Sequence, residues 1–209
     1  MPHRQSYHHG NLREALVDAA LTLIEESGPE SFSLAEAARR AGVSPAAPYR
    51  HYKGRDDLIE EVARRGLVEF SKVMAEAYGD GVPTPLHGLA RIGPAYLNFA
   101  CDKPGYYMAM FDSGISLNAS MELWDAAENA LGVLIRACGE IAAHLPEGER
   151  PPARMMANHI WAMSHGVVEL FARQKRGPRS PISSEEMLDS GVQIYLRGLG
   201  LLRTARPPI

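Results

Sequence analysis

Five basic side chains are concentrated in a short stretch, residues 39–55, that contains no acidic residue. They are Arg39, Arg40, Arg50, Lys53 and Arg55. Guanidinium and ammonium groups bind phosphate oxygens, and clustered bases of this kind are typical of nucleic-acid surfaces. The whole chain has a formal net charge of -3, so the positive face is local. The sequence therefore predicts a phosphate-binding surface within this stretch.

The same stretch carries the signals of two short helices joined by a tight turn. Ser33 followed three residues later by Glu36 is a capping-box pattern, which predicts the start of the first helix. Gly42 predicts its end, because a helix C-cap often needs a positive φ. Ser44 is the expected N-cap of a second helix over residues 45–52, with proline at its first position. Two helices around a short glycine-containing turn predict a helix-turn-helix.

The segment LAEAARRAGVSPAAPYRHYKGRDDL resembles the DNA-binding signature of the TetR family of transcriptional regulators. The resemblance rests on the turn Gly42-Val43-Ser44 and on Tyr49 and Tyr52. Two positions depart from the family pattern: Pro48 replaces an aliphatic residue in the recognition helix, and Arg55 stands where lysine is commoner. We expect Pro48 to cost little, since it would fall near the first turn of that helix. A helical hairpin without DNA binding is the competing interpretation.

The second helix of the motif is expected to read DNA. Small residues at its start, Ala46 and Ala47, would let the backbone approach base edges in the major groove. Basic and aromatic side chains beside them would hold phosphates. The predicted DNA-binding residues are Arg39, Arg40, Ser44, Ala46, Ala47, Tyr49, Arg50, His51, Lys53 and Arg55.

Helical periodicity continues through the chain, and strand signals are few, so we predict an all-α fold. A first helix over residues 11–27 would complete an N-terminal three-helix, helix-turn-helix DNA-binding domain, residues 1–55. An α-helical ligand-binding and dimerisation domain, residues 56–209, would follow it. Its expected helices cover residues 56–78, 85–101, 104–111, 117–145, 152–175 and 184–203.

Two late helices, residues 153–172 and 184–202, are hydrophobic on more than one face, which predicts self-association. The resembled family dimerises through its last two long helices. In a homodimer, two recognition helices about 34–36 Å apart could engage successive major grooves of a palindrome. A buried core helix in a monomer is the alternative.

A tryptophan, a histidine and a glycine close together in the chain suggest a second site. Trp161, His165 and Gly166 resemble the Trp-His-Gly signature in the C-terminal domain of one TetR subgroup. Trp161 and His165 lie one helical turn apart, so they could line a ligand pocket or simply pack in the core. The candidate ligand-binding residues are Phe99, Tyr107, Met110, Phe111, Trp124, Trp161, Met163 and His165.

Several other function classes find no support in the sequence. There is no His-Glu-x-x-His zinc helix, no phosphate-binding glycine loop and no Gly-x-Ser-x-Gly elbow, so we expect neither an enzyme nor a bound metal or cofactor. No apolar run reaches the roughly 18 residues of a membrane span, and no secretion signal is visible, so a cytoplasmic protein is expected. The polar segment 1–10 could be an arm that touches DNA or a disordered end.

These observations and the resemblance together predict a homodimeric transcriptional regulator that binds double-stranded operator DNA. The resemblance implies a repressor that is released from the DNA by a small molecule. A regulator controlled by a protein partner, without a small-molecule inducer, is the alternative.

Overall fold

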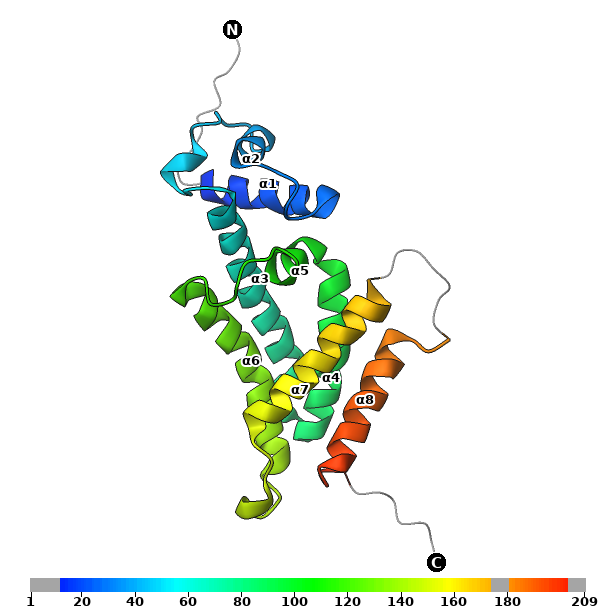
Figure 1. Cartoon of the computed structure of the whole chain (residues 1–209). Coiled ribbons are helices and arrows are strands. Elements are labelled where there is room, and N and C mark those ends of the chain that lie inside the picture. Colours follow the sequence, from blue (N-terminus) through cyan, green and yellow to red (C-terminus); the bar gives the residue numbers. More distant parts are fainter. Residues whose placement is uncertain (1–11, 174–180, 203–209) are drawn as a thin grey trace, which may run out of the picture. The chain divides into compact units, whose positions relative to one another are not determined.

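The computed structural model describes residues 12–173 and 181–202, and in these ranges every regular element is helical (Figure 1). The predicted all-α fold is therefore confirmed. The elements are α1 (Leu12–Ser27), α2 (Leu34–Arg40), the 3-10 turn η1 (Pro48–Arg50), α3 (Arg55–Tyr78), η2 (Gly79–Gly81), α4 (Pro85–Asp102), α5 (Pro104–Phe111), α6 (Met121–Ala142), η3 (Glu147–Glu149), α7 (Ala153–Val167), the π-helical turn η4 (Val168–Ala172) and α8 (Ser184–Gly198). The predicted N-terminal arm and the residue expected to cap the first helix, Asn11, lie outside the described residues.

The chain divides into two compact units that do not follow its order in sequence. The first unit holds the chain up to Leu67 together with Pro104–Asp125. The second holds Val68–Lys103 and the residues from Ala126 onward. Helices α3 and α6 each begin in the first unit and end in the second. The functional boundary predicted at residue 55 stays a prediction.

The first unit is built on the apolar face of α1. The residues of that face recur at helical spacing and are buried: Leu16, Val17, Ala19, Ala20, Leu23 and Ile24. Helices α2 and α5 both pack against α1. Close approach of α5 depends on Gly105, whose N–H donates to Glu25 Oε1 at 3.2 Å. A Cβ at this glycine would lie 2.8 Å from the same carboxylate oxygen.

The second unit has an aromatic core around Phe70. The Phe70 ring makes edge contacts with Tyr96 and Phe99 at centroid distances of 5.0 and 5.1 Å. Helix α8 packs on both α4 and α7. At the C-terminal end of α3, buried Tyr78 donates a hydrogen bond of 2.5 Å to Glu140 Oε2. Burial and this hydrogen bond raise the pKa of Tyr78.

Several helix ends differ from their predicted positions because of local capping. Helix α6 begins at Met121, where the Ser120 hydroxyl accepts from the N–H of Leu123 at 3.2 Å. The N-cap of α8 is Ser183, which forms a capping box with Glu186. That helix ends at Gly198, because Gly200 adopts a φ of +72° and turns the chain.

The predicted helix over residues 152–175 also changes character. Helix α7 ends at Val167, and the π-helical turn η4 continues to Ala172. The N–H of Arg173 donates to the carbonyl of Val168, five residues back, at 3.0 Å. Residues 174 and 175 lie outside the described ranges.

Candidate nucleic-acid interface

Helix α2 and the turn after it have the geometry that the sequence predicted. The Ser33 hydroxyl accepts from the N–H of Glu36 at 3.2 Å, which is one half of the expected capping box. Gly42 has a φ of +71°. The N–H of Val43 donates to the carbonyl of Ala38 at 2.9 Å, and that of Gly42 donates to the carbonyl of Arg39 at 3.1 Å. This Schellman arrangement ends α2 and sets the direction of the next segment.

The second helix predicted over residues 45–52 is wrong in its length and type. Only Pro48–Arg50 is helical, as the single 3-10 turn η1. The N–H groups of Ala47, Arg50 and His51 each donate to the carbonyl three residues back, at 3.0, 3.3 and 2.8 Å. Pro48 explains the change, because proline has no N–H to donate and its ring crowds the carbonyl four residues earlier. The Ser44 hydroxyl therefore caps no α-helix.

The short turn sorts its side chains between the interior and the surface. Pro48 is buried, and Tyr52 is only 4% exposed. Tyr49 is 61% exposed, and Arg50 and His51 are exposed as well. Ala46 is exposed at the start of the segment, while Ala47 is half-buried. Residues 46 and 49–51 therefore form a surface that a duplex could reach.

The basic residues predicted to bind DNA differ in whether their side chains already have partners within the protein. Arg40 makes two hydrogen bonds to the Glu26 carboxylate, at 2.9 and 2.5 Å. These bonds lower the pKa of Glu26. Arg55 donates to the backbone carbonyl of Glu30 at 3.0 Å and pairs with Asp56 at 2.8 Å. Both guanidinium groups therefore have structural partners.

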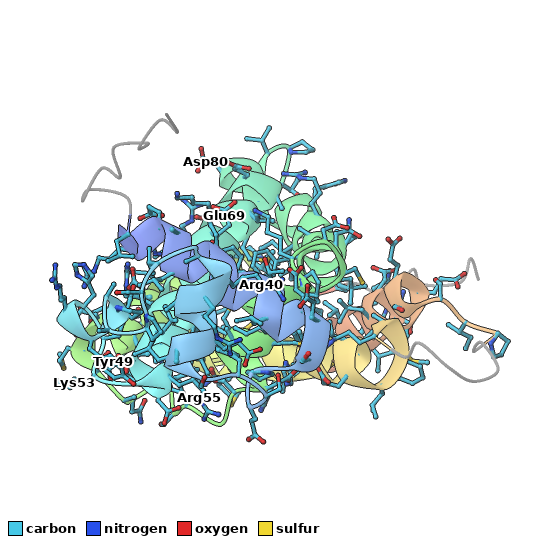
Figure 2. The ribbon with its side chains drawn as sticks, turned by 90° about the horizontal axis from the view of Figure 1, so that it is seen from above. Arg40, Tyr49, Lys53, Arg55, Glu69 and Asp80 are labelled. Atoms are coloured by element: carbon cyan, nitrogen blue, oxygen red, sulfur yellow. The ribbon has the colours of Figure 1, made fainter. Side chains whose placement is uncertain are left out.

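Three other basic residues make no side-chain hydrogen bond or ion pair with any described residue. They are Arg39, Arg50 and Lys53, and all three are exposed. Only the backbone of Lys53 is held, since its N–H donates to Asp57 Oδ2 at 2.8 Å. Figure 2 shows Lys53 and Tyr49 at the same edge of the first unit. The charges of these bases are available for phosphates.

One basic residue near this surface was not predicted. The Arg13 guanidinium of α1 lies 6.0 Å from the centre of the Tyr52 ring. Both residues line a polar hollow of ≈ 470 Å³ that also includes Lys53 and Ser120. The sequence did not mark Arg13 as a DNA-binding candidate, because it is a single arginine at the start of an amphipathic helix. Only the fold places it beside Tyr52.

The models of two domain families match the chain. The description "Bacterial regulatory proteins, tetR family" matches residues 16–62. The description "Tetracyclin repressor-like, C-terminal domain" matches residues 89–195, which is more than half of the chain. The chain belongs to the TetR family. It is therefore a DNA-binding transcriptional regulator of the helix-turn-helix type.

Individual relatives agree with this family. The uncharacterised HTH-type transcriptional regulator YobS of Bacillus subtilis is 31% identical over 104 residues, which are 48% of this chain and 51% of that protein. The match thus spans about half the length of that relative. A solved protein of unknown function from Rhodococcus sp. RHA1 has a TM-score of 0.75 at 26% identity, covering 93% of this chain and 98% of that one. The TetR-family regulator PfmR of Thermus thermophilus shares the fold, with a TM-score of 0.61 at 19% identity over 87% and 97% of the chains.

The residues predicted to bind a ligand in this TetR-family chain fall into two groups of four, one in each compact unit. The first group is Tyr107, Met110, Phe111 and Trp124. Tyr107 and Met110 are buried, and the Tyr107 and Phe111 rings meet at 4.9 Å. Trp124 is 42% exposed.

The second group is Phe99, Trp161, Met163 and His165. Trp161 contacts the Phe70 ring at a centroid distance of 6.2 Å. His165 Nδ1 lies 3.5 Å from the Tyr96 hydroxyl, at the long limit of a hydrogen bond. Met163 of α7 faces Gly191 of α8. These contacts join the residues to the core of the second unit, and their ligand-binding role stays a prediction.

Within the described residues, no helix combines the length and the apolar character that crossing a membrane requires.

Proposed function

We propose that this TetR-family regulator is a repressor that binds a palindromic operator as a homodimer and releases it when a small molecule binds. The observation that supports DNA reading is the segment at residues 44–53, where most side chains are exposed and those of Arg50 and Lys53 have no partner among the described residues. Double-helical DNA supplies the phosphates that such charges bind. We place the DNA-binding function in residues 1–55 and ligand binding with dimerisation in residues 56–209.

The proposed contacts follow from exposure and charge. Tyr49, Arg50, His51 and Lys53 hold phosphates, and Arg50 also reaches a base edge. Ala46 and Ala47 allow the backbone to approach the major groove, with Ser44 beside them. Arg39 supports the backbone contacts. Arg40 and Arg55 contribute to the positive field while they remain paired within the protein, because each already has an acidic partner.

The dimer is proposed to form through α7 and α8, which lie side by side (Figure 1). These helices and the turn η4 leave large apolar side chains exposed: Met155 is 40%, Leu170 61% and Ile194 68% exposed. A Cβ at Gly166, where α7 continues into η4, would meet no heavy atom within 4 Å. Glycine inside a helix is destabilising by about 0.5–1 kcal/mol relative to alanine, so its presence on an open face fits close approach of a second helix.

Release requires that the ligand bind two states of the dimer with different affinity. Helix α3 supplies a physical connection, since its first residue, Arg55, directly follows the DNA-reading segment and its last, Tyr78, belongs to the second unit. A ligand that favours one position of α3 in the second unit would change the separation of the two reading segments. The Trp161 and His165 pair is the proposed ligand contact.

The test is binding of the purified protein to the DNA upstream of its own gene, compared with a scrambled duplex, across a salt series. Preference for the upstream DNA is expected, with affinity falling steeply as salt rises. Tyr49→Ala should weaken this binding and leave the dimer intact. Loss of the dimer in that variant, or equal binding to both duplexes, would contradict the proposal.

A further inference from the structure

A groove runs between α4 and α8 in the second unit. Two adjoining hollows of ≈ 380 and ≈ 340 Å³ form it. Both hollows are lined by Leu89 and Ala90 of α4 and by Asp189 and Val192 of α8. We name this feature the α4–α8 groove.

The inner surface of the α4–α8 groove is mainly apolar. Its apolar side chains include Leu86, Leu89, Pro94, Leu188, Val192 and Leu196. An apolar molecule that covers this surface would remove it from water, a gain of about 25 cal/mol for each Å² buried. The groove therefore suits the hydrocarbon body of a ligand.

The charge at one end of the groove has a single sign. Glu185, Glu186 and Asp189 line the ≈ 340 Å³ hollow, and no basic residue is among its lining residues. The ≈ 380 Å³ hollow has His87 and Arg197 on its wall instead. The end formed by the ≈ 340 Å³ hollow is thus complementary to a cation.

None of the three carboxylates is neutralised by a base among the described residues. Glu186 accepts from the N–H and the hydroxyl of Ser183, at 2.9 and 2.8 Å, in the cap of α8. Asp189 accepts from the Gln193 amide at 2.7 Å. Glu185 has no hydrogen bond or ion pair with a described residue. All three carboxylates therefore lie at the groove without a basic partner among the described residues.

The backbone of α4 has an acceptor without its usual helical donor at a residue that lines the groove. Pro94 lies inside α4 and has no N–H, so the carbonyl of Ala90 lacks the donor that an α-helix normally provides four residues later. Ala90 is exposed and lines both hollows. Gly93, between Ala90 and Pro94 in the chain, has no side chain of its own, and a Cβ there would lie 3.3 Å from Leu188 Cδ2 of α8.

We propose that the α4–α8 groove binds an amphipathic monocation, with its apolar body along the leucine-lined surface and its ammonium group near Glu185 and Asp189. The carboxylates supply charge, and the Ala90 carbonyl can accept a hydrogen bond from the ammonium. This inference rests on the proposed function, because it gives release by a small molecule a second site and a chemical class of ligand. The site is separate from Trp161 and His165, which line neither hollow.

Occupation of the groove has a direct connection to the end of α3. Arg91, beside Ala90 on α4, donates to the carbonyls of Ala77 and Tyr78 at 2.7 Å each. A Cβ at Gly88 of α4 would lie 2.7 Å from the Tyr78 ring, so α4 and the end of α3 are in close contact. A ligand that moves α4 relative to α8 therefore acts on the last turn of α3.

The experiment compares three probes of equal chain length, n-octylammonium, octanoate and octan-1-ol, by isothermal titration calorimetry below micelle-forming concentrations. The full-length protein is used without DNA. Octylammonium is expected to bind at least about tenfold more tightly than the other two, because only it can use the carboxylates. Equal binding of the three probes, or tighter binding of octanoate, would overturn the proposal.

Three variants test the location. Glu185→Gln and Asp189→Asn each remove one charge and should weaken octylammonium binding about tenfold. Ala90→Phe fills the groove from an exposed position and should abolish binding without unfolding the protein. Glu147→Gln, an exposed carboxylate in η3, is the matched control and should bind as the wild type does. Unchanged binding in all of the first three variants would overturn the assignment to this groove.

Operator binding, measured with the same preparations, separates this inference from the proposed function. If the wild type reads its operator and binds no octylammonium, the groove proposal fails alone. If octylammonium binds as the variants predict while operator affinity stays constant, the groove assignment is supported and release through the groove fails.

Discussion

Pro48 stands four residues after Ser44 and cannot donate to its carbonyl, which instead accepts a hydrogen bond of 3.0 Å from the N–H of Ala47. The DNA-reading segment therefore consists of a turn and one 3-10 turn where the sequence predicted an α-helix. A shorter element offers fewer side chains to base edges. Sequence preference would then depend more on DNA shape and on bridging water.

Replacing this proline should lengthen the helix. In Pro48→Ala the restored N–H can donate to the Ser44 carbonyl, so backbone chemical shifts over residues 45–52 should move toward α-helical values. The preferred operator sequence should change in a selection from random duplexes. The salt dependence of binding should stay the same, because the basic side chains that contact phosphates are unchanged. Unaltered chemical shifts would show that Pro48 is not the cause of the 3-10 turn.

The basic side chains without a partner in the protein should contribute to DNA binding and little to the stability of the fold. Arg50→Ala and Lys53→Ala are each expected to reduce the slope of log K against log salt by about 1.8, the value for two lost phosphate contacts, one from each subunit of the dimer. Their melting temperatures should equal that of the wild type. Arg40→Ala is the comparison, since it removes the pair with Glu26. It should lower the melting temperature slightly and leave the slope nearly unchanged; a slope change as large as for Arg50→Ala would mean that Arg40 leaves Glu26 to bind DNA.

The proposed dimer surface can be tested at its most exposed described isoleucine. Ile194 is 68% exposed, so Ile194→Glu should leave the fold of one subunit intact. Burying the new charge at an interface should weaken the dimer by about 2 kcal/mol or more, which sedimentation equilibrium would detect. Met121→Glu, at a residue of α6 that is 71% exposed, is the matched control and should remain a dimer. If both variants behave alike, the interface lies elsewhere.

Arg65 joins α1 to α3 in the first unit and should make its stability depend on pH. It bonds to Glu14 at 2.5 and 2.9 Å and to Glu61 at 2.8 Å. Its hydrogen bonds hold the pKa of Glu14 below the ordinary value of 4.5. A carboxylate with a lowered pKa in the folded state stabilises the protein above its unfolded pKa, and this contribution disappears as the pH falls through the folded pKa.

Arg65→Met should therefore reduce the free energy of unfolding by roughly 1 kcal/mol at pH 7, a modest amount because the Glu14 side chain is half exposed. The difference from the wild type should shrink as the pH falls from about 5 to about 3, in urea unfolding followed by circular dichroism. Lys72→Met is the control, because its ammonium lies 4.0 Å from Glu69 and is 64% exposed. A difference that stays constant over this range would mean that Arg65 stabilises by packing alone.

Local signals determined much of the helical framework. The helix end at Gly42 and the bounds of α5, Pro104–Phe111, were predicted from the sequence and agree with the structure. Each depends on a glycine or a proline whose backbone preference acts within a few residues. The TetR family was likewise predicted from one continuous stretch, because the turn and its aromatic residues are neighbours in the chain. The placement of Ser44 as a cap failed within that stretch, because Pro48 changed the pattern of hydrogen bonds.

Only the tertiary structure decided which side chains are committed to one another. Arg40 binds Glu26, Arg55 binds the carbonyl of Glu30, and Gly105 binds Glu25, pairs separated by 14, 25 and 80 residues in the chain. The α4–α8 groove likewise brings together two helices about a hundred residues apart in the chain. Composition and periodicity carry no record of such pairs, because hydrogen bonds and apolar contacts depend on distance in space. The sequence by itself thus determined the family and most of the helices, and the packing decided which basic side chains remain available for DNA.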